Sequence, residues 1–437
     1  MARFFVLMIC LMGSFTVWAG SWNTEPLGGF DTVHLYTPDT NSPIGTGKAL
    51  LLVLHGCTQP SSAYKDYAGL DIAAETYGMI VAAPESMYKQ GFGCWGYWSG
   101  APTRTGLGND YVNILNLVAE LKKIHQIDER QVYISGLDSG GSFAMETACL
   151  APDIFAGMGL SGSQSAGTGA GGSMGPKEGT VDTVASACES YAGTYASHFD
   201  TQIISSAVGT DSTGSFVGSD GLVNRGYAPQ NAEAMARIYG VEKVGTPQAI
   251  SLDGRSGIET SYEEGRVSLL ALIGVDHAWS GGSASSGSFI SSSGINYGMY
   301  LGKYFSENNK RVNANPDNQL PQVSLNSVVD DSSILASGSI FDIDGTIASS
   351  TISLRNISTG QIDGPHALSI NLFNQYEYRF DDLIVGDYEI RVVATDDENG
   401  KTTEKSNHTI DSGDGSNDGD VDGSADGDGD SPCDYVE

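Results

Sequence analysis

Basic residues are scarce in this sequence. Its 437 residues include 22 Lys+Arg against 53 Asp+Glu, which gives a formal net charge of −31. Nucleic acids and anionic membrane surfaces attract basic proteins, so we expect neither to be a partner. A hydrophobic content of 40% with 17% charged residues is typical of a globular chain, and the length allows more than one domain.

Long apolar runs are missing as well. The N-terminal run Phe4–Val17 is too short to span a membrane, and no later run is long enough. Arg3 precedes this run and the small residues Ala19 and Gly20 follow it, a pattern typical of a secretory signal peptide cut after Ala19. The sequence therefore predicts removal of residues 1–19 and an extracellular protein without membrane insertion.

Cysteines are few and widely spaced. Five remain after the predicted cleavage, namely Cys57, Cys94, Cys149, Cys188 and Cys433. None has the close spacing of a zinc site, and no Gly-rich loop carries a phosphate-binding lysine or a dinucleotide fingerprint, so no metal or cofactor is implied. Export permits disulfides. Cys57–Cys94 and Cys149–Cys188 are the pairs that we favour, with Cys433 left over, although sequence alone does not fix the connectivity.

Residues 20–305 alternate strand-like and helix-like segments. Ala49–Leu54 and Val267–Ile273 are continuous apolar runs, as expected for strands that are buried on both faces. Asp110–Ile124 spaces its apolar residues three and four apart, which predicts an amphipathic helix, and a closing helix is expected over Ile295–Phe305. The alternation predicts an α/β domain with a mostly parallel sheet between helix layers.

The composition changes after a polar linker over residues 306–320. Residues 321–411 contain short alternating stretches separated by turns, which predicts a small all-β sandwich. Within it, Gly338–Ile347 resembles bacterial immunoglobulin-like modules that are appended to secreted enzymes. We expect this module to act as a spacer, a surface-binding module or a plain structural appendage.

The chain ends in an acidic Asp/Gly-rich stretch over residues 412–437. Such a composition is typical of a disordered, solvated tail. Asp418–Gly423 matches the first half of a calcium-binding loop, but Gly429 stands where the closing glutamate would be. At most weak calcium binding by the tail is expected.

The stretch that carries chemistry lies between a β-branched run and a helix-like segment. Gly136 and Gly140 flank Asp138 with the spacing of the G-x-S-x-G nucleophile elbow, in which a strained turn presents the central residue. The central residue here is an aspartate. Ser139 is adjacent, but as the nucleophile it would have Leu137 at the position where the elbow needs glycine.

Other segments supply the remaining parts of such a site. The turn after the early apolar strand offers the backbone N–H of Cys57 or Thr58 as one oxyanion donor, and Ser139 offers the second. His277 follows the last core strand, where a general base is expected. Asp211 and Asp220 both lie where the acid of a triad is expected, and we favour Asp220.

At these residues the chain resembles the polyhydroxyalkanoate (PHB) depolymerase family of secreted esterases. The matching pieces are Leu54–Gln59, Gly93–Trp98, Val132–Leu137, Ser139–Gly141, Asp220–Val223 and Gly274–Gly281. The resemblance implies an α/β-hydrolase fold, hydrolysis of short-chain hydroxyalkanoate or related esters, a Cys57–Cys94 disulfide, and a serine where this chain has Asp138. It also places four aromatic residues near the cleft, where they would either bind an aliphatic polyester or pack against the disulfide, namely Trp95, Tyr97, Trp98 and Trp279.

Asp138 leaves several hypotheses beside the family activity. A triad needs a hydroxyl that histidine deprotonates, and a carboxylate attacks an ester poorly. An esterase could use the displaced Ser139, or Asp138 could be a substitution on an otherwise active background. Haloalkane dehalogenases and epoxide hydrolases use an aspartate at this position to attack saturated carbon. Finally, the chain could be a non-catalytic homologue that binds polyester surfaces.

Overall fold

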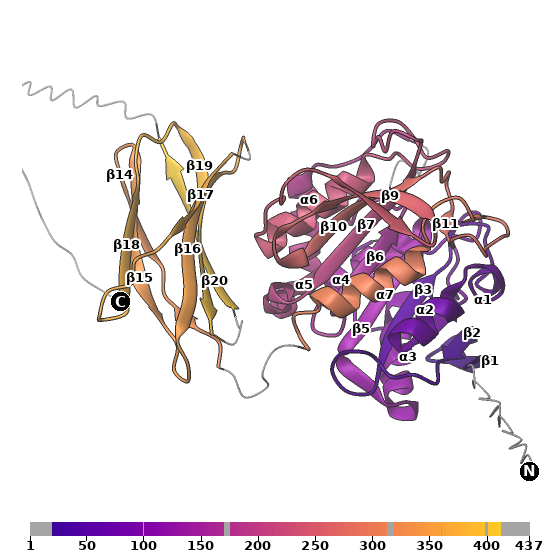
Figure 1. The fold of residues 1–437 in the computed structure, drawn as a ribbon. Coiled ribbons are helices and arrows are strands. Elements are labelled where there is room, and N and C mark those ends of the chain that lie inside the picture. Colours follow the sequence, from indigo (N-terminus) through magenta and orange to yellow (C-terminus); the bar gives the residue numbers. More distant parts are fainter. Residues whose placement is uncertain are drawn as a thin grey trace, which may run out of the picture. The chain divides into compact units, whose positions relative to one another are not determined.

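The computed structural model describes residues 20–98, 100–169, 175–312, 319–359, 361–397 and 401–411 (Figure 1). The chain divides into two compact units, residues 1–317 and 318–437. The predicted signal peptide, Cys433 and the acidic tail lie outside the described residues, and nothing supports the predicted calcium binding of that tail. In the part of the chain that the structure describes, no helix is both long and apolar enough to cross a membrane.

The first unit is built on a ten-stranded mixed sheet. In sheet order the strands are β1 (Ser21–Leu27), β2 (Phe30–Thr37), β4 (Met79–Pro84), β3 (Lys48–Leu54), β5 (Ile127–Leu137), β6 (Gly157–Ser161), β7 (Ile203–Thr210), β10 (Val267–Ile273), β9 (Arg255–Ser261) and β8 (Gln248–Leu252). The six strands from β4 to β10 run parallel, and both edges are antiparallel. The central strands are almost entirely buried, as their apolar sequences predict.

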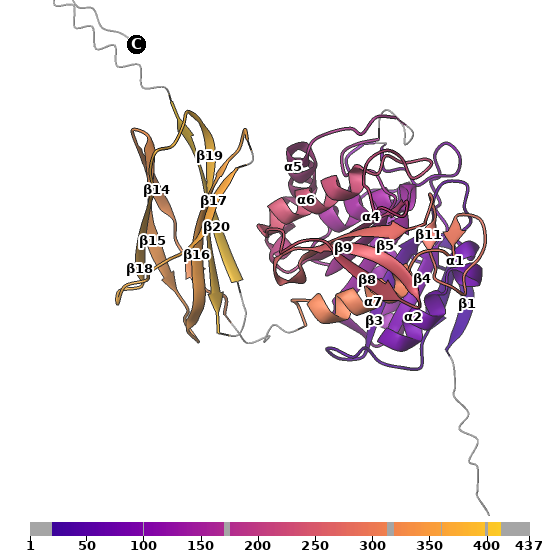
Figure 2. The same cartoon turned by 45° about the horizontal axis from the view of Figure 1, so that its top comes forward.

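Helices cover both faces of this sheet (Figures 1 and 2). They are α1 (Ser62–Tyr67), α2 (Leu70–Tyr77), α3 (Asp110–Ile124), α4 (Ser139–Leu150), α5 (Val181–Ala192), α6 (Tyr227–Tyr239) and α7 (Tyr297–Asn308). Side chains of α3 to α6 belong to one apolar cluster, and those of α1, α2 and α7 belong to the other. The unit is therefore a three-layer α/β domain.

Polar caps explain where two of the helices begin. The side chain of Asn109 accepts the N–H of Val112 at 2.9 Å, so α3 has the bounds that its periodicity predicts. Asn296 caps α7 in the same way through the N–H of Met299. This cap moves the start of α7 two residues past the predicted one, and the helix continues to Asn308, into the segment that we had predicted as linker.

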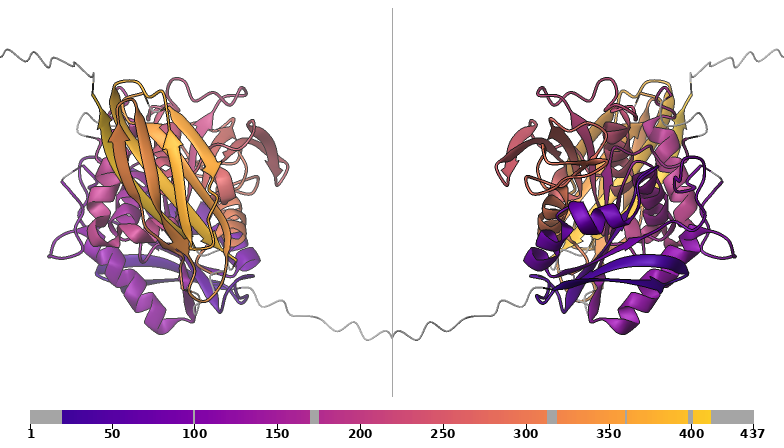
Figure 3. Two further views of the ribbon diagram at one scale, coloured as in Figure 1. Left: turned by 90° about the vertical axis from the view of Figure 1, so that its left-hand side faces the viewer. Right: turned by 90° about the vertical axis from the view of Figure 1, so that its right-hand side faces the viewer.

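The second unit is a β-sandwich of two four-stranded sheets, coloured orange to yellow in Figure 3. One sheet contains β13 (Gln322–Val323), β14 (Asn326–Asp330), β15 (Ser333–Phe341) and β18 (Gln375–Phe380). The other has the order β17 (Ile362–Ala367), β16 (Ile347–Asn356), β19 (Gly386–Asp396) and β20 (Lys401–Ile410). Buried residues alternate along β16 and β19, as expected for strands with one face on a core.

Candidate active site

Asp138 lies on a strained turn between β5 and α4. Its backbone has φ +55° and ψ −123°, a conformation that a residue with a side chain rarely adopts. Glycine is required on both sides. A Cβ on Gly136 would lie 2.4 Å from the carbonyl carbon of Gly140, and one on Gly140 would lie 2.4 Å from the carbonyl oxygens of Leu54 and His55. The chain has therefore kept the backbone geometry of the elbow while its central side chain is a carboxylate.

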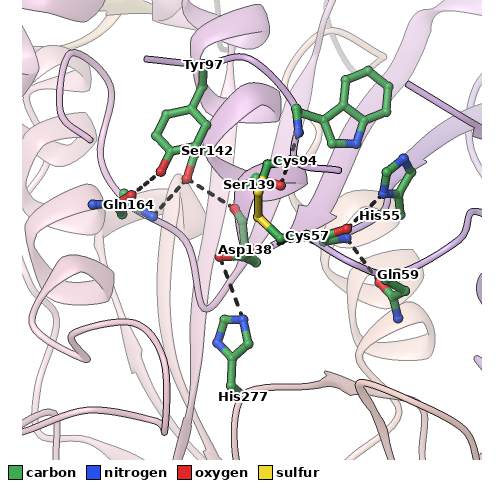
Figure 4. The surroundings of a disulfide bond; sticks show 12 residues. His55, Cys57, Gln59, Cys94, Tyr97, Asp138, Ser139, Ser142, Gln164 and His277 are labelled. Carbon is green, nitrogen blue, oxygen red and sulfur yellow. Dashed lines mark hydrogen bonds and ion pairs between the residues drawn. A yellow bond between two sulfur atoms is a disulfide. The ribbon is translucent and has the colours of Figure 1, made fainter. Parts of the chain in front are cut away.

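His277 is held between two aspartates. Its Nδ1 lies 2.9 Å from Oδ2 of Asp220, and its Nε2 lies 3.7 Å from Oδ1 of Asp138 (Figure 4). Burial lowers the pKa of His277, but the hydrogen bond to Asp220 and the charges of both aspartates outweigh it, so the pKa stands above its ordinary value. This arrangement orients the imidazole for proton transfer at residue 138.

Asp220 is itself fixed by backbone donors. Its Oδ1 accepts the N–H groups of Leu222 (3.1 Å) and Val223 (2.8 Å), which leaves Oδ2 for the histidine. The alternative acid, Asp211, is exposed and bonds the amide and hydroxyl of Thr213 in a local turn. The structure thus brings Asp220, and not Asp211, to His277.

The carboxylate of Asp138 is bound by the first oxyanion donor. The N–H of Cys57 donates to Oδ2 of Asp138 at 3.0 Å. The N–H of Thr58, the alternative donor, points elsewhere and bonds the carbonyl of Phe92 at 2.8 Å. The turn is supported by Gln59, whose Oε1 accepts the N–H of Gly56 at 3.0 Å. Asp138 therefore holds the amide that an ester oxyanion would need.

Ser139 does not face the histidine. Its Oγ accepts the N–H of Trp95 at 3.3 Å, and its side chain is buried. Figure 4 shows Ser139 and His277 on opposite sides of Asp138. The geometry gives no support to Ser139 as a displaced nucleophile, because its hydroxyl bonds the N–H of Trp95 and Nε2 of His277 faces Asp138.

Two of the four predicted substrate-binding aromatic residues are in the core. Trp95 and Trp279 are both 0% exposed. Trp95 packs against His55 and Phe143, with ring centroids 5.4 and 5.0 Å away. Trp279 packs against two tyrosines, Tyr64 and Tyr297. Their complete burial favours packing over substrate contact for these two side chains.

The other two predicted aromatic residues differ in exposure, because Tyr97 is buried and Trp98 is partly exposed. Tyr97 is buried and its hydroxyl donates to Oε1 of Gln164 (Figure 4), and burial followed by the charge of Asp138 raises its pKa. Trp98 is 37% exposed and packs edge-on against Tyr97, with ring centroids 4.8 Å apart. Of the four predicted aromatic residues, Trp98 is the one with surface to offer a ligand.

Three residues near the site were not predicted from the sequence. Gly162, with φ +53°, follows β6, and a Cβ there would lie 2.9 Å from Oδ2 of Asp220. Gln164 bonds Ser142 Oγ through its N–H at 2.9 Å, and Phe289 lies edge-on to His277 with centroids 6.2 Å apart. The position of Gly162 and Gln164 after the carboxyl end of a central strand was an available signal, because site residues gather at that edge of a parallel sheet.

Two disulfides link parts of this domain. Cys57 pairs with Cys94, and Cys149 pairs with Cys188, which are the pairs favoured from the sequence. The first ties the turn that carries the Cys57 amide to the segment that ends in Trp98. The second joins α4, the helix that starts at the elbow, to α5. Both constrain elements that position Asp138.

Comparison with known proteins finds related esterases. A family model described as Esterase PHB depolymerase matches residues 34–178, which include the Cys57 turn and the elbow. The poly(3-hydroxybutyrate) depolymerase of Ralstonia pickettii is 32% identical over 323 residues, which are 68% of this chain and 63% of that protein. Acetylxylan esterase A of Emericella nidulans is 31% identical over 125 residues, or 28% and 39% of the two chains.

These matches leave part of each relative uncovered. The chain spans less than two thirds of the length of the curated relatives described above. Among solved structures, an acetyl xylan esterase from Aspergillus awamori is similar to 59% of this chain and 94% of that chain, with 20% identity and a TM-score of 0.46. The sequence matches support a PHB depolymerase-family esterase.

Proposed function

We propose that the α/β domain is a carboxylic ester hydrolase for short-chain hydroxyalkanoate esters or polyesters, in which Asp138 keeps the rate low. The proposal depends on one arrangement: Asp220 bonds His277, and His277 faces residue 138. The Cys57 amide donates to the carboxylate of Asp138 at the same place. The names of the Ralstonia pickettii and Emericella nidulans relatives, a polyester depolymerase and an acetylxylan esterase, support this substrate class.

The residues have separate roles in this proposal. His277 takes a proton from the attacking group, and Asp220 fixes its tautomer and stabilises the imidazolium. The amides of Cys57 and Ser139 bind the oxyanion. A serine at position 138 would complete the set. Asp138 has no proton to give, its attack on an ester yields an anhydride that collapses back, and its Oδ2 competes with the substrate for the Cys57 amide.

The test is hydrolysis of p-nitrophenyl butyrate and of a PHB film by the parent protein, Asp138→Ser and Ser139→Ala. We expect Asp138→Ser to exceed the parent by about 10³-fold or more, because loss of a triad nucleophile costs on that order. Ser139→Ala should leave the parent rate unchanged. An Asp138→Ser variant that is folded and no faster than the parent would contradict the proposal.

The same experiment decides between hydrolysis and binding alone. A parent protein that adsorbs to the PHB film, releases no soluble product and gains nothing from Asp138→Ser would be a polyester-binding homologue.

Export is part of the proposal and is supported by the predicted signal peptide and by the two disulfides. N-terminal sequencing of the exported protein should start at Gly20.

A further inference from the structure

We infer that Asp138 is a nucleophile toward saturated carbon: it displaces a halide from a small alkyl halide, and His277 activates the water that hydrolyses the resulting alkyl ester. This reaction goes beyond the proposed ester hydrolysis. It uses the same site but does not depend on that proposal, because the attacked atom and the bond that breaks are different.

The two oxygens of the Asp138 carboxylate have different surroundings. Oδ2 accepts the N–H of Cys57 at 3.0 Å, while Oδ1 lies on the side of His277. The 3.7 Å between Oδ1 and Nε2 is longer than a hydrogen bond but within reach of an ion pair. Oδ2 is held by the Cys57 amide, and Oδ1 faces the imidazole without a hydrogen bond to it. A carboxylate with this arrangement suits attack on a saturated carbon, where no oxyanion forms.

The hydrogen bond from the Cys57 amide to Asp138 hinders ester cleavage but assists hydrolysis of an alkyl ester on Asp138. In an ester cleavage, the oxyanion forms on the substrate, and Asp138 competes with it for the Cys57 amide. In hydrolysis of an alkyl ester on Asp138, the oxyanion forms on Oδ2 itself, which already accepts the N–H of Cys57. The amide is thus in place for the second step before any substrate binds.

The steps balance without a further reactant. Oδ1 attacks the carbon, an O–C bond forms, and the C–halogen bond breaks with its electron pair leaving as halide. Water then loses a proton to Nε2 of His277 and adds to Cγ of Asp138. The tetrahedral species expels the alkoxide, which takes the proton back from His277. The products are an alcohol, a halide and a proton, and Asp138 has gained one oxygen from water.

The geometry restricts the substrate class. The first step supplies no proton to the leaving group, so that group must depart as a stable anion such as bromide. Phe289, 6.2 Å from His277 between ring centroids and only partly buried, offers apolar surface near the site. A negatively charged substrate would be repelled by Asp138. Neutral primary alkyl bromides fit these conditions.

The test uses the full-length protein and 1-bromobutane. We expect the parent to release bromide, and His277→Phe to accumulate a butyl ester on Asp138 that peptide mass spectrometry locates. Parent protein turned over in ¹⁸O-labelled water should carry the label in the Asp138 carboxylate. This second readout keeps the test valid if His277→Phe fails to fold.

Two variants serve as controls. Asp138→Asn should lose both bromide release and the adduct, whereas Asp211→Asn, which removes an exposed carboxylate, should change neither. Absence of bromide release from the parent together with absence of ¹⁸O in Asp138 would overturn the inference. The outcome is separate from the ester hydrolysis proposal, because Asp138→Ser would gain ester hydrolysis and have no alkyl halide activity.

Discussion

Each unit of the molecule contains a histidine that is hydrogen-bonded to an aspartate. In the α/β unit, His277 Nδ1 lies 2.9 Å from Asp220, and in the sandwich His366 Nε2 lies 2.7 Å from Asp363. The shorter pair is the less constrained one. Its carboxylate is exposed, its histidine stacks on Tyr378, and the two residues are three apart on one strand.

The difference is in what surrounds each pair. His277 and Asp220 are both buried, and the second ring nitrogen of His277 faces the residue on the strained elbow. Solvent screens an exposed pair, so the His366 pair contributes little. A short histidine–aspartate distance therefore does not identify a site. A catalytic pair is identified instead by its burial, by a fixed tautomer of the histidine, and by a residue that faces the second ring nitrogen.

The largest expected effect tests this comparison directly. In an Asp138→Ser background, His277→Ala should lower hydrolysis of p-nitrophenyl butyrate by at least about 10³-fold, because no other group accepts the proton at residue 138. His366→Ala in the same background should leave the rate unchanged. Equal losses in both variants would mean that His277 acts through overall stability, and thermal unfolding of each variant separates the two explanations.

A second prediction concerns the two neighbouring tryptophans of the disulfide segment. Trp95 is fully buried and Trp98 is 37% exposed. Trp95→Ala should lower the free energy of unfolding by about 3–5 kcal/mol, and Trp98→Ala by less than about 1 kcal/mol. Trp98→Ala should instead raise KM for a long-chain ester with little change in kcat. Urea unfolding and steady-state kinetics of the two variants check this, and similar stability losses would contradict the assigned burial.

A third prediction compares two glycines with nearly the same positive φ. Gly162 (φ +53°) lies against Asp220, whereas a Cβ on Gly193 (φ +52°) would have no atom within 4 Å. Both alanine variants carry the backbone strain of a positive φ, about 1–3 kcal/mol. Only Gly162→Ala should also displace the Asp220–His277 pair and lower activity of the Asp138→Ser variant by about 10-fold or more. Equal activities would contradict this positioning role.

The smallest expected effect is a titration. The negative charge of Asp138 is one of the influences that raise the pKa of His277, so Asp138→Asn should lower that pKa. Resonances of the His277 imidazole followed by NMR against pH would show this. An unchanged pKa for His277 would mean that the two side chains are farther apart than 3.7 Å in solution.

Much of this architecture could be predicted from the sequence. Continuous apolar runs identify the central strands, periodicity gives the bounds of α3, and glycine spacing locates the elbow. Asp220 and His277 follow from chain order. These features depend on the local sequence pattern or on the order of the strands along the chain, and the sequence alone gives both.

Other features depend on contacts between distant segments. The burial of Trp95 and Trp279 is decided by partners such as Phe143 and Tyr64, which the run of residues around each tryptophan does not reveal. The direction of Ser139 depends on the N–H of Trp95, 44 residues away in the chain. The antiparallel strands β1, β8 and β9 are half-exposed, so they lack the apolar signal of the central strands.

The central claim is that residue 138, and not its neighbour, is the position that His277 and the Cys57 amide serve. The most direct measurement is covalent labelling by an alkyl fluorophosphonate of the parent, Asp138→Ser, and Asp138→Ser with Ser139→Ala. The account predicts no label on the parent and one label per chain, at position 138, on both variants. Labelling of the parent at Ser139, or a folded Asp138→Ser variant without label, would contradict it.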